Sequence, residues 1–123
     1  MTAPNIVNVS SIYGKSVFDA DIATTKSAIL TNAASSSKVL KVNSLIISNI
    51  DGSASADITA TIENAAGNSV NSTIAKTIAV PADATLALIS KDISIYLEED
   101  MSIHLLASAA GDLSAICSYE EIS

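Results

Sequence analysis

The chain has 123 residues, the size of one domain, and with 49% hydrophobic and 15% charged residues it is not expected to be disordered. Its formal net charge is −7 and its six basic residues are all lysine, so we expect no binding to nucleic acid or to anionic membranes. Its apolar runs are shorter than the roughly 20 residues that span a bilayer, and residues 1–10 lack the features of a signal peptide, so synthesis in the cytoplasm without export by a signal route is expected.

Short runs rich in Ile, Val and Thr, separated by small polar residues, predict β-strands along the whole chain. In chain order we expect strands at 5–12, 16–24, 27–31, 38–50, 56–63, 72–80, 85–90, 94–97, 102–108 and 113–122. A helix within 20–36 is the competing interpretation there. Turn residues recur at intervals of about eight to twelve, which is typical of a sandwich or barrel. We therefore predict a single domain, residues 1–123, with an all-β antiparallel two-sheet sandwich. A jelly roll is preferred, and an immunoglobulin-like topology is the alternative.

Two of the expected strands carry apolar residues on both faces. Residues 45–47 are Leu-Ile-Ile, and Ile116 alternates with Leu113 and Cys117 in the last strand. A β-bulge would explain such a pattern. Because the outer faces of a two-sheet sandwich normally contact water, a partner chain that covers the second face is the other explanation.

The residues that most often carry chemistry are scarce. His104 alternates with Ile103 and Leu105, so we expect it to point away from the core as a surface or interface residue. Cys117 has no basic neighbour that would activate its thiol, and we expect it to be a small core residue. No catalytic or cofactor-binding residue is predicted.

Two acidic segments raise the question of a metal ion. Oxygen-bearing side chains alternate through 51–57, but the sixth and twelfth positions, which an EF-hand fills with Gly and Glu, are Ala56 and Ile62. A hairpin turn is therefore expected at 51–57. The run 98–100, Glu-Glu-Asp, is expected to be a solvated turn between two strands. No metal ligand is predicted, although a divalent cation near either segment remains an open alternative.

Several segments of the second half share a pattern with known proteins. Residues 80–89 read VPADATLALI, residues 95–100 read IYLEED, and residues 117–122 read CSYEEI. This order resembles small β-sandwich virion structural proteins of tailed bacteriophages, of the marine and cyanobacterial phage type. Residues 41–52, KVNSLIISNIDG, are similar to a further segment of that group. The chain departs from the pattern at Asp100-Met101, where the group has Gly-Asp.

The resemblance, which covers residues 38–122, implies a non-enzymatic component of a virion. Among such components we expect a capsid decoration or cement protein that bridges subunits of the major capsid protein and stabilises the assembled shell. Neck, tail, baseplate and fibre-base structural proteins are the alternatives. A host-surface adhesion module is a further alternative, although the four aromatic residues offer few platforms for a sugar.

We also expect the chain to form a homo-oligomer. A trimer is favoured because closed cyclic symmetry suits the local three-fold positions of a capsid. Residues 1–13 are expected to be a strand or arm that adds to the sheet edge of a neighbour, or else a strand that completes its own sandwich. The residues expected to contact the neighbour are Ile6, Val7, Val9, Ile12 and Tyr13.

Overall fold

The structure is a computed structural model that describes residues 4, 5 and 7–123. In this part of the chain, strands account for all regular structure except one short 3-10 helix, η1 (Lys91–Ile93). The strands are β1 (Ile12–Asp19), β2 (Ser27–Asn32), β3 (Val39–Asn49), β4 (Ala56–Glu63), β5 (Val70–Val80), β6 (Thr85–Ile89), β7 (Ile95–Leu97), β8 (Met101–Ala107) and β9 (Leu113–Ile122).

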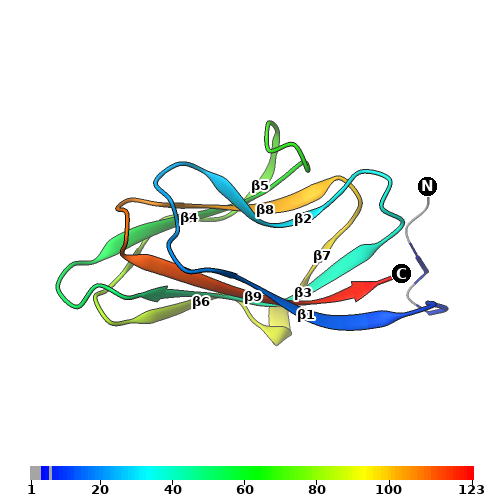
Figure 1. The fold of residues 1–123 in the computed structure, drawn as a ribbon, viewed down its shortest axis with the longest axis horizontal. Coiled ribbons are helices and arrows are strands. Elements are labelled where there is room, and N and C mark those ends of the chain that lie inside the picture. The colour runs from blue at the N-terminus through cyan, green and yellow to red at the C-terminus, as the bar shows by residue number, and fades with distance from the viewer. Residues whose placement is uncertain (1–3, 6) are drawn as a thin grey trace.

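The strands form two antiparallel sheets that pack face to face (Figure 1). Sheet A has the order β1-β9-β3-β6, and β7 also pairs with β3. Sheet B has the order β2-β8-β4-β5. Because β6 and β7 pair with successive parts of β3, they act as one strand that η1 interrupts.

The pairing partners are nested along the chain. β1 pairs with β9, β2 with β8, β3 with β6 and β7, and β4 with β5. A chain folded back on itself in this way and wound into two sheets is a jelly roll. The structure confirms the predicted all-β sandwich and selects the jelly roll over the immunoglobulin-like topology.

From residue 27 onward, each predicted strand matches an observed one to within two residues at each end. The prediction was wrong at the N-terminus: β1 runs over Ile12–Asp19 and not over 16–24, and the described residues 5 and 7–11 of the expected strand 5–12 are not in a strand. The reason is local: the side-chain oxygen of Asn5 accepts a hydrogen bond from the Val7 amide at 2.9 Å, and its carbonyl accepts one from Asn8 at 3.0 Å. These bonds make a turn in place of extended backbone. The competing helix within 20–36 is not formed either.

Most connections cross between the two sheets. The β4–β5 connection is a hairpin, whereas β3 lies in sheet A and β4 lies in sheet B. The hairpin expected at 51–57 is therefore wrong, because that segment crosses from one sheet to the other. Residues 98–100 form a turn between two strands, as expected, and they too cross between sheets, from β7 to β8.

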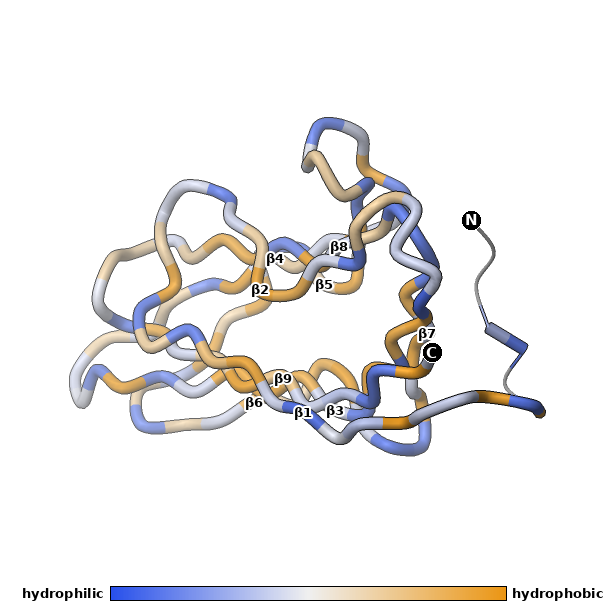
Figure 2. Tube along the Cα trace, turned by 45° about the vertical axis from the view of Figure 1, so that its right-hand side comes forward, coloured by the Kyte–Doolittle hydropathy of each residue, from blue (hydrophilic) through white to orange (hydrophobic). Residues whose placement is uncertain are grey.

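Alternating side chains from both sheets fill the core. Leu45 and Ile47 of β3 are fully buried, as are Ile103 and Leu105 of β8. Hydrophobic residues recur along the strands of both layers, whereas hydrophilic residues gather in the connections (Figure 2). Cys117 of β9 belongs to this core, which confirms its prediction as a small core residue.

Two buried asparagines fasten the crossing connections to the ends of the sandwich. Asn49, the last residue of β3, donates from its side-chain amide to the carbonyls of Val80, at 2.8 Å, and Ala54, at 3.0 Å. Its side-chain oxygen accepts a hydrogen bond from the Asp51 amide at 2.8 Å. Asn32, the last residue of β2, likewise donates from its side-chain amide to two carbonyls. These are the carbonyl of Lys38, just before β3, at 2.9 Å and that of Leu97, the last residue of β7, at 3.0 Å.

Replacing Asn49 should therefore destabilise the fold. Asn49→Ala leaves two carbonyls without their donor, and we expect it to lower the free energy of unfolding by about 1–3 kcal/mol. Asn71→Ala, at an exposed position of β5, is the matched control and should change it by less than about 0.5 kcal/mol. Urea unfolding of both variants measures the difference, and equal effects would contradict the capping role of Asn49.

Candidate functional site

The outer face of sheet A carries a row of apolar side chains across four strands. The pairing register places Phe18 of β1 beside Ile116 of β9, Ile116 beside Ile46 of β3, and Ile46 beside Ala87 of β6. We call these four residues the apolar row. Their neighbours in sequence, such as Leu45 and Ile47, fill the core, so the row faces away from it.

The row explains the two strands that carry apolar residues on both faces. β3 pairs with β9 without a register shift from Ser44 to Asn49. Its pairing with β6 does shift between Leu45 and Ile46, but the extra residue, Leu88, belongs to β6, so a bulge in β3 does not account for Ile46. Ile46 and Ile116 are outward-facing residues of regular strands. Whether a partner chain covers them remains a prediction.

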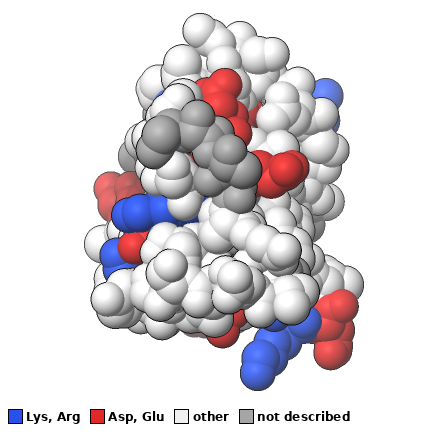
Figure 3. Space-filling model, turned by 90° about the vertical axis from the view of Figure 1, so that its right-hand side faces the viewer, with Lys and Arg blue, Asp and Glu red and all other residues white. Residues whose placement is uncertain are grey.

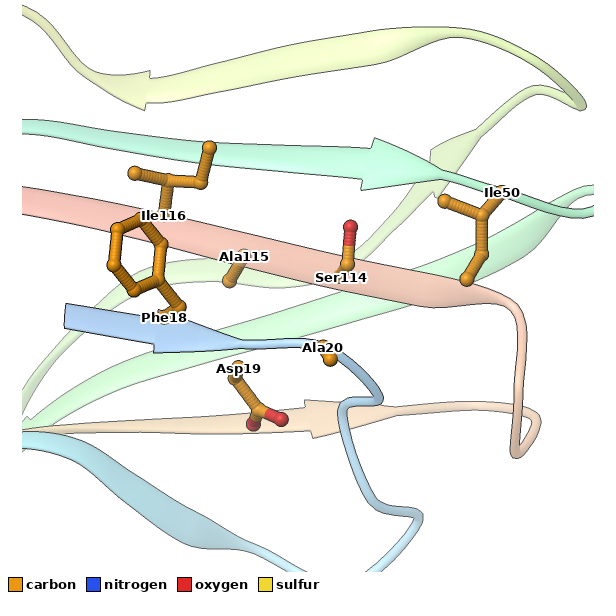
Figure 4. A pocket seen from close by; sticks show the side chains of 7 residues that line it. All are labelled: Phe18, Asp19, Ala20, Ile50, Ser114, Ala115 and Ile116. Carbon is orange, nitrogen blue, oxygen red and sulfur yellow. The ribbon is translucent and has the colours of Figure 1, made fainter.

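The row is open to solvent and lies between small hydroxyl residues. Phe18, the single phenylalanine of the chain, is 72% exposed, and Ile116 beside it is partly exposed. Phe18 and Ile116 lie side by side, whereas Asp19 points to the opposite side of β1 (Figure 4). The two flanking rows hold Ser16, Ser118 and Ser44 on one side and Ser114, Ser48 and Thr85 on the other.

This face is nearly free of charge. Among the outward-facing residues of β1, β9, β3, β6 and β7, all of which the structure describes, the charged ones are Lys41 and Glu120. These two residues are cross-strand partners, so their charges balance. The end of the sandwich at which the C-terminus lies differs, because acidic and basic side chains are scattered over it (Figure 3).

A shallow hollow of about 350 Å³ lies beside Phe18. Phe18, Ile50 and Ile116 contribute apolar walls, and Ser114 lies between them (Figure 4). The hollow and the apolar row thus form one continuous surface. An aromatic or branched apolar side chain from another molecule would lose water-exposed area by entering it.

The predicted contact residues lie near the start of β1. Ile6 lies outside the described residues. Val7 is 90% exposed in the turn before β1, and Val9 is half-buried. Ile12 and Tyr13 are the first residues of β1 and are more than half exposed. Contact of these side chains with another subunit stays a prediction.

The sequence did not reveal a buried polar cluster on the outer face of sheet B. Glu63, at the end of β4, is fully buried, and its carboxylate accepts hydrogen bonds from Lys26 Nζ at 2.7 Å and from Thr61 Oγ1 at 2.5 Å. The Oγ atom of Ser102 lies 3.1 Å from Nδ1 of His104 and donates to the Asn64 carbonyl at 2.8 Å. His104 does point away from the core, but the expectation that it lies at the surface is wrong.

Gly67, in the β4–β5 hairpin, explains the burial of His104. This glycine has a φ of 74°, and a Cβ atom built on it would lie 2.6 Å from Nε2 of His104. The hairpin can therefore close over the imidazole because residue 67 has no side chain. Lys26 fastens it from the other side, since Nζ also donates to the Gly67 carbonyl at 3.3 Å.

Ionisable groups elsewhere do not form a metal centre. In the part of the chain that the structure describes, no group of three or more His, Cys, Asp or Glu residues is arranged to hold a metal ion. Three connections bring Asp51 and Asp112 together near Asp21. Hydrogen bonds from Ser53 lower the pKa of Asp51, whereas desolvation and the charge of Asp51 raise the pKa of Asp112. Burial raises the pKa of the Cys117 thiol to about 12, which disfavours the thiolate.

The comparisons with known proteins give information on the fold of this chain and none on its function. No protein-family model matches this chain, and no curated protein matches it. A solved structure with a similar fold comes from work describing Bacillus endospore appendages as a novel family of disulfide-linked pili. The likeness covers 92% of this chain and 88% of the other, with 15% identity and a TM-score of 0.54. The described residues include no helix long and apolar enough to cross a membrane.

A side chain at residue 67 should loosen the hairpin from His104. Gly67→Ala combines an unfavourable φ with a clash, whereas Gly111→Ala has a φ of 80° but meets no atom within 4 Å. We expect Gly67→Ala to cost at least about 1 kcal/mol more than Gly111→Ala. Thermal and urea unfolding provide the comparison. Equal losses for the two variants would show that the contact with His104 is not tight.

Glu63 should make the stability of the fold depend on pH. Burial acts to raise the pKa of this carboxyl, but hydrogen bonds from Lys26 and Thr61 and the charges of His104 and Lys26 outweigh it, so the pKa lies below its ordinary value of 4.5. Ionised Glu63 therefore stabilises the fold above that value, and this contribution is lost as the pH falls through the folded-state pKa.

Glu63→Gln should consequently be less stable than the wild type at neutral pH and should lose less stability on acidification. Glu98→Gln, in the exposed turn after β7, should leave the profile close to that of the wild type. Melting temperatures measured from neutral pH to about pH 3 test both variants. If the melting temperatures of Glu63→Gln and of the wild type fall in parallel with pH, Glu63 is not the cause of the loss of stability in acid.

Proposed function

We propose that this chain is a non-enzymatic structural protein of a virus particle, and specifically a capsid decoration protein that bridges subunits of the major capsid protein. The observation that carries the proposal is the outer face of sheet A, with its exposed Phe18 and its single balanced pair of charges. Such a face, in a chain with a net charge of −7, suits contact with another protein surface.

The resemblance to phage virion proteins supports the same proposal. It covers residues 38–122, which include β3, β6, β7 and β9, and thus four of the five strands of sheet A. The jelly roll is also a fold that viral capsid proteins use, although a fold by itself does not decide function.

The placement of the reactive side chains favours a structural role over catalysis. Cys117 is closed inside the core, and the His104 ring is held between Ser102 and the β4–β5 hairpin. These are the residue types that most often act as nucleophile and general base. Here both are used in packing.

Decoration of this kind works by mass action. A protein that binds the assembled shell but not its separate subunits shifts the equilibrium toward assembly, in proportion to the logarithm of its concentration over the dissociation constant. The edge strand β1 offers a second point of attachment, because no strand among the described residues lies beside its outer edge in sheet A. The contact predicted from the sequence for residues 1–13 would lie at this edge, since residues 7–11 lead into β1 and residues 12 and 13 begin it.

A subunit of a filament, tail or neck is the second candidate. The fold likeness to the pilus protein, over most of both chains, is the observation that favours it. A filament linked by disulfides fits this chain poorly, because Cys117 is its single cysteine and is buried in the core. A filament of this chain would therefore depend on non-covalent contacts.

Binding to virus particles tests the proposal. Virus particles are purified from the biological source of the gene, and quantitative mass spectrometry gives the number of copies of this chain per particle. A decoration protein should be present in hundreds of copies. A ring in the neck or tail would contain a few to about a dozen copies. Absence from the particles would overturn the proposal.

The purified chain should also rebind to particles from which it has been stripped, and deletion of residues 1–9 should weaken that binding more than it lowers the melting temperature. The deletion ends before Ser10, whose amide bonds to the Ser123 carbonyl, so the pairing of β1 with β9 is retained. Equal losses of binding and stability would show that the N-terminal segment does not contribute to the contact with the particle.

A further inference from the structure

We propose that a second copy of this chain binds the outer face of sheet A, with the two copies facing each other across a two-fold axis. The contact would centre on the apolar row and include the hollow beside Phe18. It requires only the surface of the chain itself. In such a dimer the outer face of sheet A is occupied, so the capsid contact proposed above would fall to the β1 edge and the N-terminal segment. Three properties of this face support a second copy as its occupant.

The first property is charge. Two chains that each carry a net charge of −7 repel one another over most of their surfaces. The outer face of sheet A escapes this repulsion, because its two charges, Lys41 and Glu120, are opposite and adjacent. A two-fold axis brings residue i of one copy to residue j of the other and the reverse. Lys41 of each copy can then pair with Glu120 of the other, which makes the face complementary to itself.

The second property is shape. Phe18 protrudes from the face, and the hollow between Phe18, Ile50 and Ile116 lies directly beside it. A protrusion and a hollow on the same face are what a two-fold contact requires, since each copy supplies both. Phe18 of each copy would enter the hollow of the other. Buried aromatic side chains of this kind contribute much of the binding free energy in protein interfaces.

The third property is area. Four strands of about eight residues, at ordinary strand spacing, present a face of roughly 500 Å². Two such faces would bury about 1,000 Å² together, which is near the lower limit for a specific protein–protein interface. The expected dimer is therefore weak, with monomer and dimer in measurable exchange at micromolar concentrations. Its stability should depend strongly on a single side chain such as Phe18.

Sedimentation equilibrium of the chain, residues 1–123, over a range of concentrations tests the proposal. The wild type should show a monomer–dimer equilibrium. Phe18→Ser should raise the dissociation constant at least tenfold, while Val70→Ser, which removes an exposed apolar side chain from β5 in sheet B, should leave it unchanged. Ala87→Lys places a charge at the exposed end of the row and should weaken the dimer as Phe18→Ser does.

A charge exchange tests the arrangement of the two copies. Lys41→Glu and Glu120→Lys should each weaken the dimer, and the double variant should restore it, because the two-fold pairs are then re-formed with their signs exchanged. Melting temperatures show that the variants remain folded. A wild type that stays monomeric, a trimer, or a dimer that Phe18→Ser and Ala87→Lys leave intact would overturn the proposal. The molecular masses obtained by sedimentation equilibrium also test the trimer expected from the sequence.

Discussion

The register between β3 and β9, the two inner strands of sheet A, is the constraint on which the rest of the structure depends. It aligns Leu45 with Cys117 inside the core and Ile46 with Ile116 outside it. Strand side chains alternate between faces, so a slip of one residue would exchange the two sets. The core against sheet B and the apolar row on the other side are therefore consequences of one alignment. β1 and β6 then extend the row, because Phe18 pairs with Ile116 and Ala87 pairs with Ile46, on the continuous side of the register shift between β3 and β6.

Much of the fold could be predicted because alternation is a local property. β4 and β8 show it clearly, and the nested pairing then follows one of a few topologies open to a two-sheet sandwich. The crossings could not be predicted, since a turn residue does not encode which sheet the next strand joins. Asn49 illustrates the difference: its place near the end of a strand was predicted, but its bond to the Val80 carbonyl depends on a segment 31 residues away. Asp100 adopts a φ of 63°, a left-handed backbone conformation that glycine adopts most readily.

The candidate surface was predictable only in part. Ile46 and Ile116 stood out as apolar residues on the wrong face of their strands, whereas Phe18 did not, because its exposure depends on the pairing of β1 with β9. The cluster around Glu63 and His104 was missed for a similar reason. Alternation placed both side chains outside the core, but their burial results from a hairpin that closes over them where Gly67 leaves room. A sequence pattern cannot show that one segment covers another.

The outer faces of the two sheets therefore differ in what covers them. On sheet B the chain covers polar groups with its own hairpin and pairs them, whereas on sheet A it leaves an apolar row in water. Because Phe18 stays mostly exposed, it adds little to the stability of the isolated chain. The edges of sheet A differ as well: η1, with Lys91 exposed, interrupts the edge formed by β6 and β7 and hinders strand addition there. This leaves the outer face and the β1 edge as the parts of sheet A that can be covered by another chain, and both lie where the apolar row begins.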